Sequence, residues 1–185
     1  MNYLIASDLH GSAYYTDLLV TRWEQEPADR LLLLGDLLYH GPRNDLPEAY
    51  APKRVIEQLN PLADVILACR GNCDAEVDQM VLKFPLMADY VLLEEAGRTI
   101  FMTHGHVYDE QRHPYLVPGS IVLHGHTHIP AVQKQADGVW YLNPGSVAIP
   151  KGGSQPSYMT LTDGQLALRR LQDGSILQQL NLADL

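Results

Sequence analysis

The chain has 185 residues, of which 46% are hydrophobic and 19% are charged, and this composition predicts one globular domain over residues 1–185. Its 22 acidic and 13 basic side chains give a net charge of -9, which argues against a general nucleic-acid binder and against a polybasic membrane contact. Two cysteines are too few for a disulfide framework, and no apolar run has transmembrane length. We therefore expect a cytoplasmic protein.

The first half of the chain alternates apolar runs with amphipathic segments. We expect strands over residues 2–7, 31–34 and 64–68, and helices over residues 13–25 and 53–60. Ser12 has the side chain of a helix N-cap, and Asn60-Pro61 ends the second helix. Three prolines within residues 39–52 predict an irregular loop. The order strand, helix, strand, helix, strand predicts a parallel, doubly wound half.

The second half carries the signals of β-hairpins. Gly97 separates two strand-like runs, at 90–94 and 98–103, and Asp-Gly pairs occur at 137–138, 163–164 and 173–174. Further strands are expected over 120–123, 157–162 and 165–171, with irregular chain over 105–118. This half is therefore predicted to be mostly antiparallel β. The sequence has no linker, low-complexity tract or repeat between the halves, so two sheets should share one core.

Five of the strand-like runs end in Asp, Asn or His. The polar residues that follow these runs are Asp8, His10, Asp36, Asn72, His104, His126 and His128. Polar side chains at the carboxyl ends of buried strands line the binding crevice of α/β proteins. His126 and His128 stand two residues apart, so on an extended segment both point to one side and one cation could bind both.

These seven oxygen and nitrogen donors suit manganese, iron or zinc better than a soft cation. Seven ligands exceed what one ion takes while keeping an open position, but they fill two ions if one carboxylate bridges. Two divalent ions ~3.5–4 Å apart clamp the attacking and leaving oxygens of an in-line displacement. With only two carboxylates among the ligands, about two positive charges stay uncompensated, which favours a phosphate anion as substrate.

Each candidate also has a purely structural interpretation. The His126/His128 pair could be hydrogen-bonding histidines, and the two aspartates could cap a helix or a turn. Asp74 is expected to cap or brace its loop rather than to touch metal. His106 and His124 are expected to form hydrogen bonds around the site and not to be ligands.

Five sequence blocks occur in a fixed order over about residues 1–130. They are Asp8-x-His10, Gly35-Asp36, Gly71-Asn72-x-Asp74, His104 and Gly125-His126-x-His128. With the turn Asn143-Pro144-Gly145-Ser146 and the small size, they make the chain resemble the calcineurin-like metallophosphoesterases, in particular their compact bacterial and archaeal phosphodiesterase branch. The resemblance implies an α/β (α+β) fold, namely a four-layer α/β/β/α sandwich of two mixed β-sheets flanked by helices.

The resemblance also implies a set of ligands. One ion would be held by Asp8, His10, Asp36 and His128, and the other by Asp36, Asn72, His104 and His126, with Asp36 bridging. The family often uses manganese, with iron and zinc as variants. We therefore expect two divalent metal ions as cofactors, with Mn²⁺ first and Fe or Zn²⁺ as alternatives.

One position departs from the family pattern. The family usually has His where this chain has Cys73, directly after Asn72. That His is thought to protonate the leaving group, and a thiol, with an ordinary pKa of ~8.5, should do this poorly. We expect Cys73 to limit turnover on poor leaving groups, and a redox or nucleophilic role is the alternative. Arg70 precedes the motif, as in the related Ser/Thr phosphatases, where it binds phosphate; a surface salt bridge is the other interpretation.

The sequence therefore predicts a metal-dependent phosphodiesterase in which a metal-bridging hydroxide attacks a small phosphodiester, with Asn72 holding an ion and orienting the site. Substrate specificity is expected in the loops at 39–52 and 105–118. The alternatives are a phosphomonoesterase or protein phosphatase, and a non-catalytic binding scaffold like the retromer subunit of this fold. The acidic charge balance disfavours a nuclease, and strand edges in the second half would permit a homo-oligomer.

Overall fold

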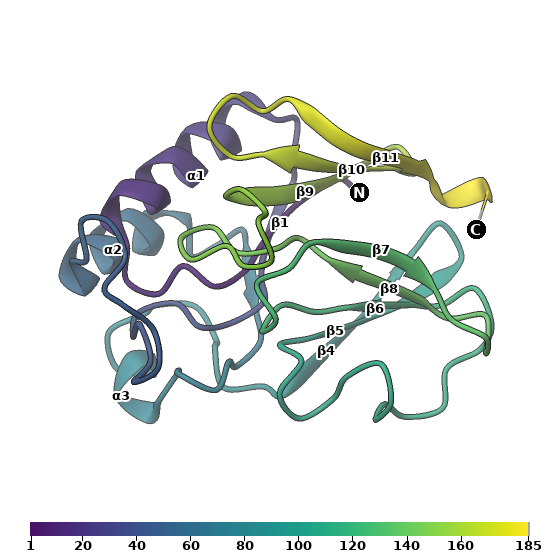
Figure 1. Cartoon of the computed structure of the whole chain (residues 1–185), viewed down its shortest axis with the longest axis horizontal. Helices are drawn as coiled ribbons and strands as arrows, with labels where there is room; N and C mark the ends of the chain where they lie inside the picture. Colours follow the sequence, from purple (N-terminus) through teal and green to yellow (C-terminus); the bar gives the residue numbers. More distant parts are fainter. Residues whose placement is uncertain (185) are drawn as a thin grey trace.

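A computed structural model describes residues 1–184 of the chain, which form two stacked β-sheets with helices on one side (Figure 1). The first sheet has six strands in the order β11-β10-β9-β1-β2-β3. Their bounds are β1 Tyr3–Ala6, β2 Arg30–Leu33, β3 Ile66–Ala68, β9 Ser157–Thr162, β10 Gln165–Arg170 and β11 Ile176–Asn181. Strands β1, β2 and β3 are parallel, as the alternating first half predicts, and β9 pairs antiparallel with β1.

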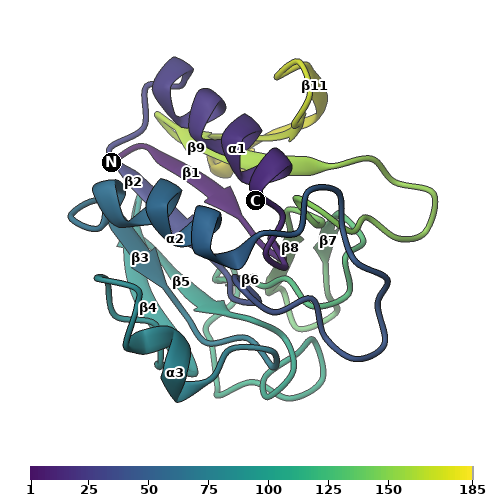
Figure 2. The same cartoon turned by 90° about the vertical axis from the view of Figure 1, so that its left-hand side faces the viewer.

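The helices belong mainly to the first half of the chain. Figure 2 shows α1 (Ala13–Gln25) and α2 (Pro52–Leu59) lying across strands β1 to β3. Ser12 caps α1 as expected, because its Oγ accepts a hydrogen bond from the Tyr15 main-chain N–H at 3.3 Å. Short helical turns follow at Asn60–Leu62, α3 (Glu76–Gln79) and Leu182–Asp184. No helix in the described part of the chain is long and apolar enough to cross a membrane.

The second sheet has five strands in the order β4-β5-β6-β8-β7. Their bounds are β4 Tyr90–Glu95, β5 Arg98–Thr103, β6 Ile121–Leu123, β7 Ala131–Lys134 and β8 Trp140–Asn143. The hairpins predicted at Gly97 and at 137–138 are present as β4–β5 and β7–β8. However, β6 pairs parallel with both β5 and β8, so this sheet is mixed rather than antiparallel throughout.

The hydrophobic core forms two layers around the first sheet. On β1, Leu4 and Ala6 face α1 and α2, whereas Tyr3 and Ile5 face the second sheet. This split follows from the alternation of side chains along a strand, and it explains why the runs of the first half are apolar on both faces. The outer face of the second sheet packs against the loop between β5 and β6, through residues such as Tyr108. That covering layer is loop and not helix.

Candidate metal centre

The loops that follow β1, β2, β3, β5 and β6 meet at one edge of the two sheets. Asp8 and His10 come after β1, Asp36 after β2, and His104 after β5, and all four side chains are buried. His128 lies beyond β6 and is also buried. The parallel pairing of β1 with β2 and of β5 with β6 places these ends on the same side, where ligand sites of α/β proteins form.

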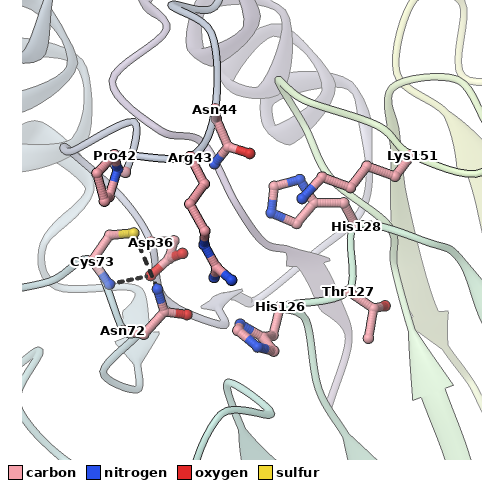
Figure 3. A pocket seen from close by; sticks show the side chains of 11 residues that line it. Asp36, Pro42, Arg43, Asn44, Asn72, Cys73, His126, Thr127, His128 and Lys151 are labelled. Atoms are coloured by element: carbon pink, nitrogen blue, oxygen red, sulfur yellow. Dashed lines mark hydrogen bonds between the residues drawn. The ribbon is translucent and has the colours of Figure 1, made fainter.

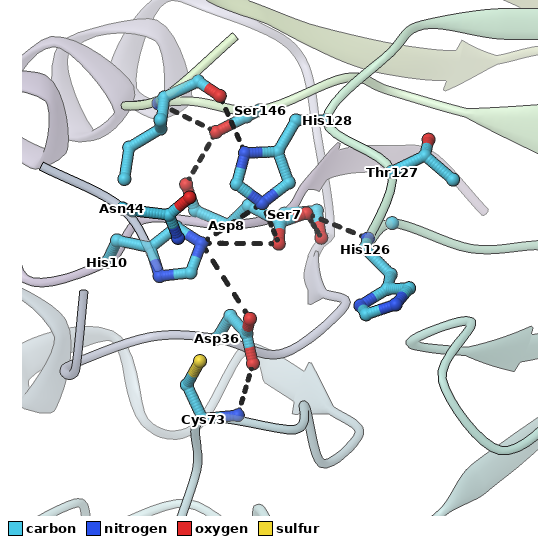
Figure 4. Close-up of polar contacts among 12 residues, drawn as sticks. Ser7, Asp8, His10, Asp36, Asn44, Cys73, His126, Thr127, His128 and Ser146 are labelled. Atoms are coloured by element: carbon cyan, nitrogen blue, oxygen red, sulfur yellow. Dashed lines mark hydrogen bonds and ion pairs between the residues drawn. The ribbon is translucent and has the colours of Figure 1, made fainter. Parts of the chain in front are cut away.

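Two buried carboxylates lie among three histidine Nε2 atoms. Oδ1 of Asp8 is 3.2 Å from Nε2 of His128 and 3.5 Å from Nε2 of His10. Oδ2 of Asp36 is 3.7 Å from Nε2 of His10 and 3.5 Å from Nε2 of His104. Figure 4 shows His10, His128 and Asp8 converging on one point, with Asp36 beside them. The sets Asp8/His10/His128 and Asp8/Asp36/His104 each have ligand atoms within 4.8 Å of one another and could hold a metal ion.

The orientation of the three histidine rings is fixed from behind by main-chain carbonyls. The Nδ1 atoms donate to these oxygens: His10 to Tyr39 at 2.8 Å, His104 to Leu34 at 2.6 Å and His128 to Ile149 at 2.6 Å. A carbonyl can only accept, so Nδ1 carries the proton and Nε2 of the neutral ring directs a lone pair into the site. This is the usual arrangement behind a metal-binding imidazole.

The acceptor atoms of His10, His128 and Asp8 that converge in the site have no hydrogen-bond donor between them. Nε2 of His10 and Nε2 of His128 are 3.2 Å apart, and Oδ1 of Asp8 has no hydrogen-bond partner among the residues that the structure describes. Three electron-rich atoms therefore converge in a buried space, which is unfavourable unless a positive charge lies between them. The donor set, of imidazole nitrogen and carboxylate oxygen, fits manganese, iron or zinc.

The electrostatics of the site also favour bound positive charge. Burial opposes the charge of Asp8, but the close His10 and His128 rings outweigh it and hold the pKa of this carboxyl well below its ordinary value. Burial likewise lowers the pKa of His104, but the hydrogen bond and charge of Asp36 raise it to about 9. The carboxylates thus attract protons onto the histidines, and a cation could replace these protons.

The backbone of the site is strained. Five non-glycine residues have φ angles in the left-handed region: Asp8 (58°), His10 (47°), Asp36 (56°), His126 (66°) and His128 (61°). Such conformations are uncommon outside glycine and cost of order 1–3 kcal/mol each, and they concentrate at functional sites. All five belong to the ligand set expected from the sequence.

Two glycines of the sequence blocks let the loops approach the carboxylates. A Cβ at Gly71 would overlap Oδ1 and the main-chain nitrogen of Asp36. A Cβ at Gly125 would overlap Oγ of Ser7 and would lie 2.7 Å from Oδ2 of Asp8. Any larger side chain at these positions would displace a carboxylate, which explains the Gly-Asn and Gly-His pairs in the sequence.

Asp74 braces the loops, as expected from the sequence. Its buried carboxylate accepts hydrogen bonds from three main-chain N–H groups, those of Asp36 (2.8 Å), Leu37 (2.9 Å) and Gly71 (2.7 Å). The loop after β2 is thereby tied to the loop after β3. Asp74 acts as an acceptor for the backbone and is absent from the candidate metal-binding groups of the described residues.

Asn72 and His126 lie near His104 but outside the buried groups. Oδ1 of Asn72 is 3.2 Å from Nε2 of His104, and the ring of His126 lies 5.1 Å from the His104 ring, centroid to centroid. Burial and then the charge of His104 lower the pKa of His126 to about 4, so its ring is neutral at pH 7. The His126 main-chain N–H donates to Asp8 at 3.1 Å.

The Cys73 thiol lies closer to the centre than the sequence indicates. Its Sγ belongs to a third group of potential metal-binding atoms, with His10 and Asp36. The Cys73 main-chain N–H donates to Oδ1 of Asp36 at 2.8 Å (Figure 4). Burial, followed by the charge of Asp36, raises the pKa of the thiol to about 12, so it remains protonated at neutral pH.

A cavity of about 430 Å³ opens over these groups. Asp36, Asn72, Cys73, His126 and His128 contribute to its walls, and the remaining walls come from residues 41–44, Thr127 and Lys151 (Figure 3). Part of the loop at 39–52 therefore lines the site, as expected. Arg70, expected to contact phosphate, is not among the lining residues, whereas Arg43 and Lys151 are. Lys151 follows no motif, and only the folded chain brings it to the cavity.

Among known proteins, the calcineurin-like phosphoesterase superfamily domain matches residues 1–164, and the chain belongs to this superfamily. It is 45% identical over 181 residues to the phosphodiesterase YfcE of Escherichia coli K12, covering 97% of both chains. The solved structure of E. coli YfcE, described as a phosphoesterase, aligns with a TM-score of 0.95 at 42% identity over 98% of this chain and 100% of that one. The expected two-sheet metallophosphoesterase fold is thereby confirmed.

More distant relatives share the architecture. The probable metallophosphoesterase YsnB of Bacillus subtilis is 28% identical over 169 residues, covering 88% of this chain and 84% of YsnB. Vps29 of Entamoeba histolytica, solved in complex with zinc, aligns with a TM-score of 0.68 at 20% identity over 98% of this chain and 99% of that one. At this identity the likeness concerns the fold alone.

Proposed function

We propose that the chain is a phosphodiesterase that cleaves small phosphodiesters and depends on two divalent metal ions. The single observation that carries this proposal is the convergence of Asp8 Oδ1, His10 Nε2 and His128 Nε2 in a buried space without a donor between them. The 45% identity to a protein named as a phosphodiesterase supports the substrate class. A phosphomonoesterase and a binding scaffold are the alternatives that the experiment below separates.

The proposed ligands divide into two groups that share Asp36. Asp8, His10, Asp36 and His128 would hold one ion, and Asp36, Asn72, His104 and His126 the other, with Mn²⁺ as the first choice and Fe or Zn²⁺ as alternatives. Two such ions would supply a nucleophile from water near neutral pH and would offset the negative charge that develops on the phosphate oxygens. The oxygen of Asn72 would act as a ligand without adding negative charge.

The side chains of the cavity would orient the substrate and serve the leaving group. His126 is neutral at pH 7 and can bind through a lone pair rather than repel a cation. The Cys73 thiol keeps its proton and can donate only a weak hydrogen bond to a departing oxygen. Asn72 would orient the site, and Arg70 would contact phosphate. A cytoplasmic location and assembly into a homo-oligomer stay predictions.

The direct test is hydrolysis of a chromogenic phosphodiester beside the matching monoester, on metal-stripped protein to which manganese, zinc, magnesium or nothing is added back. We expect cleavage of the diester that requires added metal and that is lost in Asp36→Asn. Preferential cleavage of the monoester would favour the phosphomonoesterase. If two ions bind by metal analysis but no metal restores cleavage of either ester, the scaffold function takes precedence and the proposal fails.

A further inference from the structure

Two basic side chains line the cavity and have no acidic partner. Arg43 comes from the loop between β2 and α2, and Lys151 from the loop between β8 and β9. Both are exposed, and neither side chain forms a hydrogen bond or an ion pair with another residue over the described range 1–184. Figure 3 shows Arg43 reaching toward Asn72 and His126, and Lys151 extending toward His128. In a chain with a net charge of -9, two unneutralised cations at one cavity form a positive rim.

The main chain below each cation is held in place. Lys151 N–H donates to the carbonyl of His128 at 3.1 Å, which links it to a proposed metal ligand. Beside Arg43, the Asn44 side chain donates to the carbonyl of His40 at 2.8 Å and anchors the turn that starts at Gly41. The two cations therefore project from anchored loops at the cavity, while their long side chains stay free to meet a ligand.

The positive charge at the cavity exceeds what a simple phosphodiester can neutralise. Under the proposed function, on which this inference rests, the two ions and their two carboxylates leave about two positive charges for one phosphodiester anion. Arg43 and Lys151 add two more at the cavity. We propose that these two residues form a second anion-binding subsite and that the preferred substrates are phosphodiesters with a terminal phosphate on one ester arm.

A phosphate fits this pair better than other anions. A terminal phosphate carries a charge of about -1.5 to -2 at pH 7, which two cations balance, whereas a carboxylate would leave one cation unpaired. The planar Arg fork binds two phosphate oxygens at once, and the Lys ammonium adds a point charge. A long polyanion is disfavoured because the chain as a whole carries a net charge of -9 and would repel it.

The test compares two chromogenic diesters that differ by one group: p-nitrophenyl ethyl phosphate and the analogue whose ethyl arm ends in a phosphate. The two share the leaving group, so the ratio of their kcat/KM values reports the second subsite. We expect the ratio to favour the phosphorylated arm by about tenfold or more, mainly through KM, because a charge-assisted contact is worth ~1.5–3 kcal/mol. The ratio should fall toward one in Arg43→Gln and Lys151→Gln, and further in the double variant.

The matched control is Lys53→Gln, which removes an exposed cation on α2, away from the cavity, and changes net charge equally. It should keep the wild-type ratio. Calorimetric binding of ethyl phosphate and of ethylene glycol bisphosphate to the metal-loaded protein gives a readout independent of turnover, with the bisphosphate bound more tightly only when Arg43 and Lys151 are present. Equal affinities in the wild type, or an unchanged ratio in the double variant, overturns the subsite. Absence of diester cleavage with the binding difference intact overturns the phosphodiesterase and not the subsite.

Discussion

At the scale of single residues, the carboxylate of Asp74 holds the loop after β2 to the loop after β3. It is 2% exposed and accepts three main-chain hydrogen bonds. Asp74→Ala leaves three buried N–H groups without an acceptor, so we expect it to lower the free energy of unfolding by about 3 kcal/mol or more. Urea denaturation of the metal-free protein measures this loss. The control Asp45→Ala, at an exposed position, should stay within about 0.5 kcal/mol of the wild type, and an equal effect of both would contradict the bracing role.

The Cys73 thiol should limit turnover on substrates with poor leaving groups. Because the thiol donates a hydrogen bond weakly, it should assist an alkoxide leaving group less than an imidazolium would. We expect Cys73→His to raise the rate on an alkyl diester by a larger factor than the rate on an aryl diester, since the aryl leaving group needs little protonation. Rates on the two esters at saturating metal give the answer. If the ratio of the two rates is the same in both proteins, Cys73 does not limit turnover on poor leaving groups.

Among the elements, β2 is a strand whose leucines, Leu31, Leu32 and Leu33, are all buried. Leu33 is fully buried between the sheet and the helices, whereas Leu92, on the edge strand β4, is 57% exposed. Leu33→Ala should lower the free energy of unfolding by about 2–5 kcal/mol, because it leaves a cavity in the core. Leu92→Ala removes the same atoms from a solvated face and should cost less than about 0.5 kcal/mol. Chemical denaturation of both variants checks the difference, and similar losses would argue against two distinct environments.

Much of this architecture is predictable from local patterns. Apolar runs and Asp-Gly turns locate most strands, and the cap at Ser12 places α1 at residues 13–25 as observed. Four-residue α3 has no detectable periodicity, so the sequence does not reveal it. The parallel pairing of β6 with β5 and β8 depends on contacts across the sheet that no local signal encodes.

The candidate site is also only partly predictable from the sequence. The sequence motifs predict that five side chains lie together, and the structure places them close to one another: Asp8, His10, Asp36, His104 and His128. Their roles as ligands stay predictions. Cys73 is predicted at the site and lines the cavity, whereas Lys151 has no sequence signal, because its position depends on how the loop after β8 folds over the sheet ends.

At the scale of the whole molecule, Tyr141 connects the second sheet to the loop that covers it. Its hydroxyl donates to the carbonyl of Glu110 at 3.1 Å, and burial raises the pKa of Tyr141 to about 12. An unfolded tyrosine titrates near pH 10, so the stabilisation from Tyr141 is complete below about pH 10 and is lost as the pH rises toward 12. We expect the difference in free energy of unfolding between wild type and Tyr141→Phe to shrink from pH 9 to pH 11.5. Urea titrations at several pH values measure it, and a constant difference would show that Tyr141 titrates alike in both states.

The left-handed backbone at Asp8, His10, Asp36, His126 and His128 has a consequence for how this molecule responds to selection. Glycine or asparagine tolerates that conformation better, so replacing one of these residues removes strain from the metal-free chain. A substitution that raises thermal stability at any of these five positions would therefore lower activity. Directed evolution that selects only for thermal stability would therefore produce an inactive protein with the fold intact. To avoid this outcome, metal has to be present in the medium and turnover has to be measured in every round.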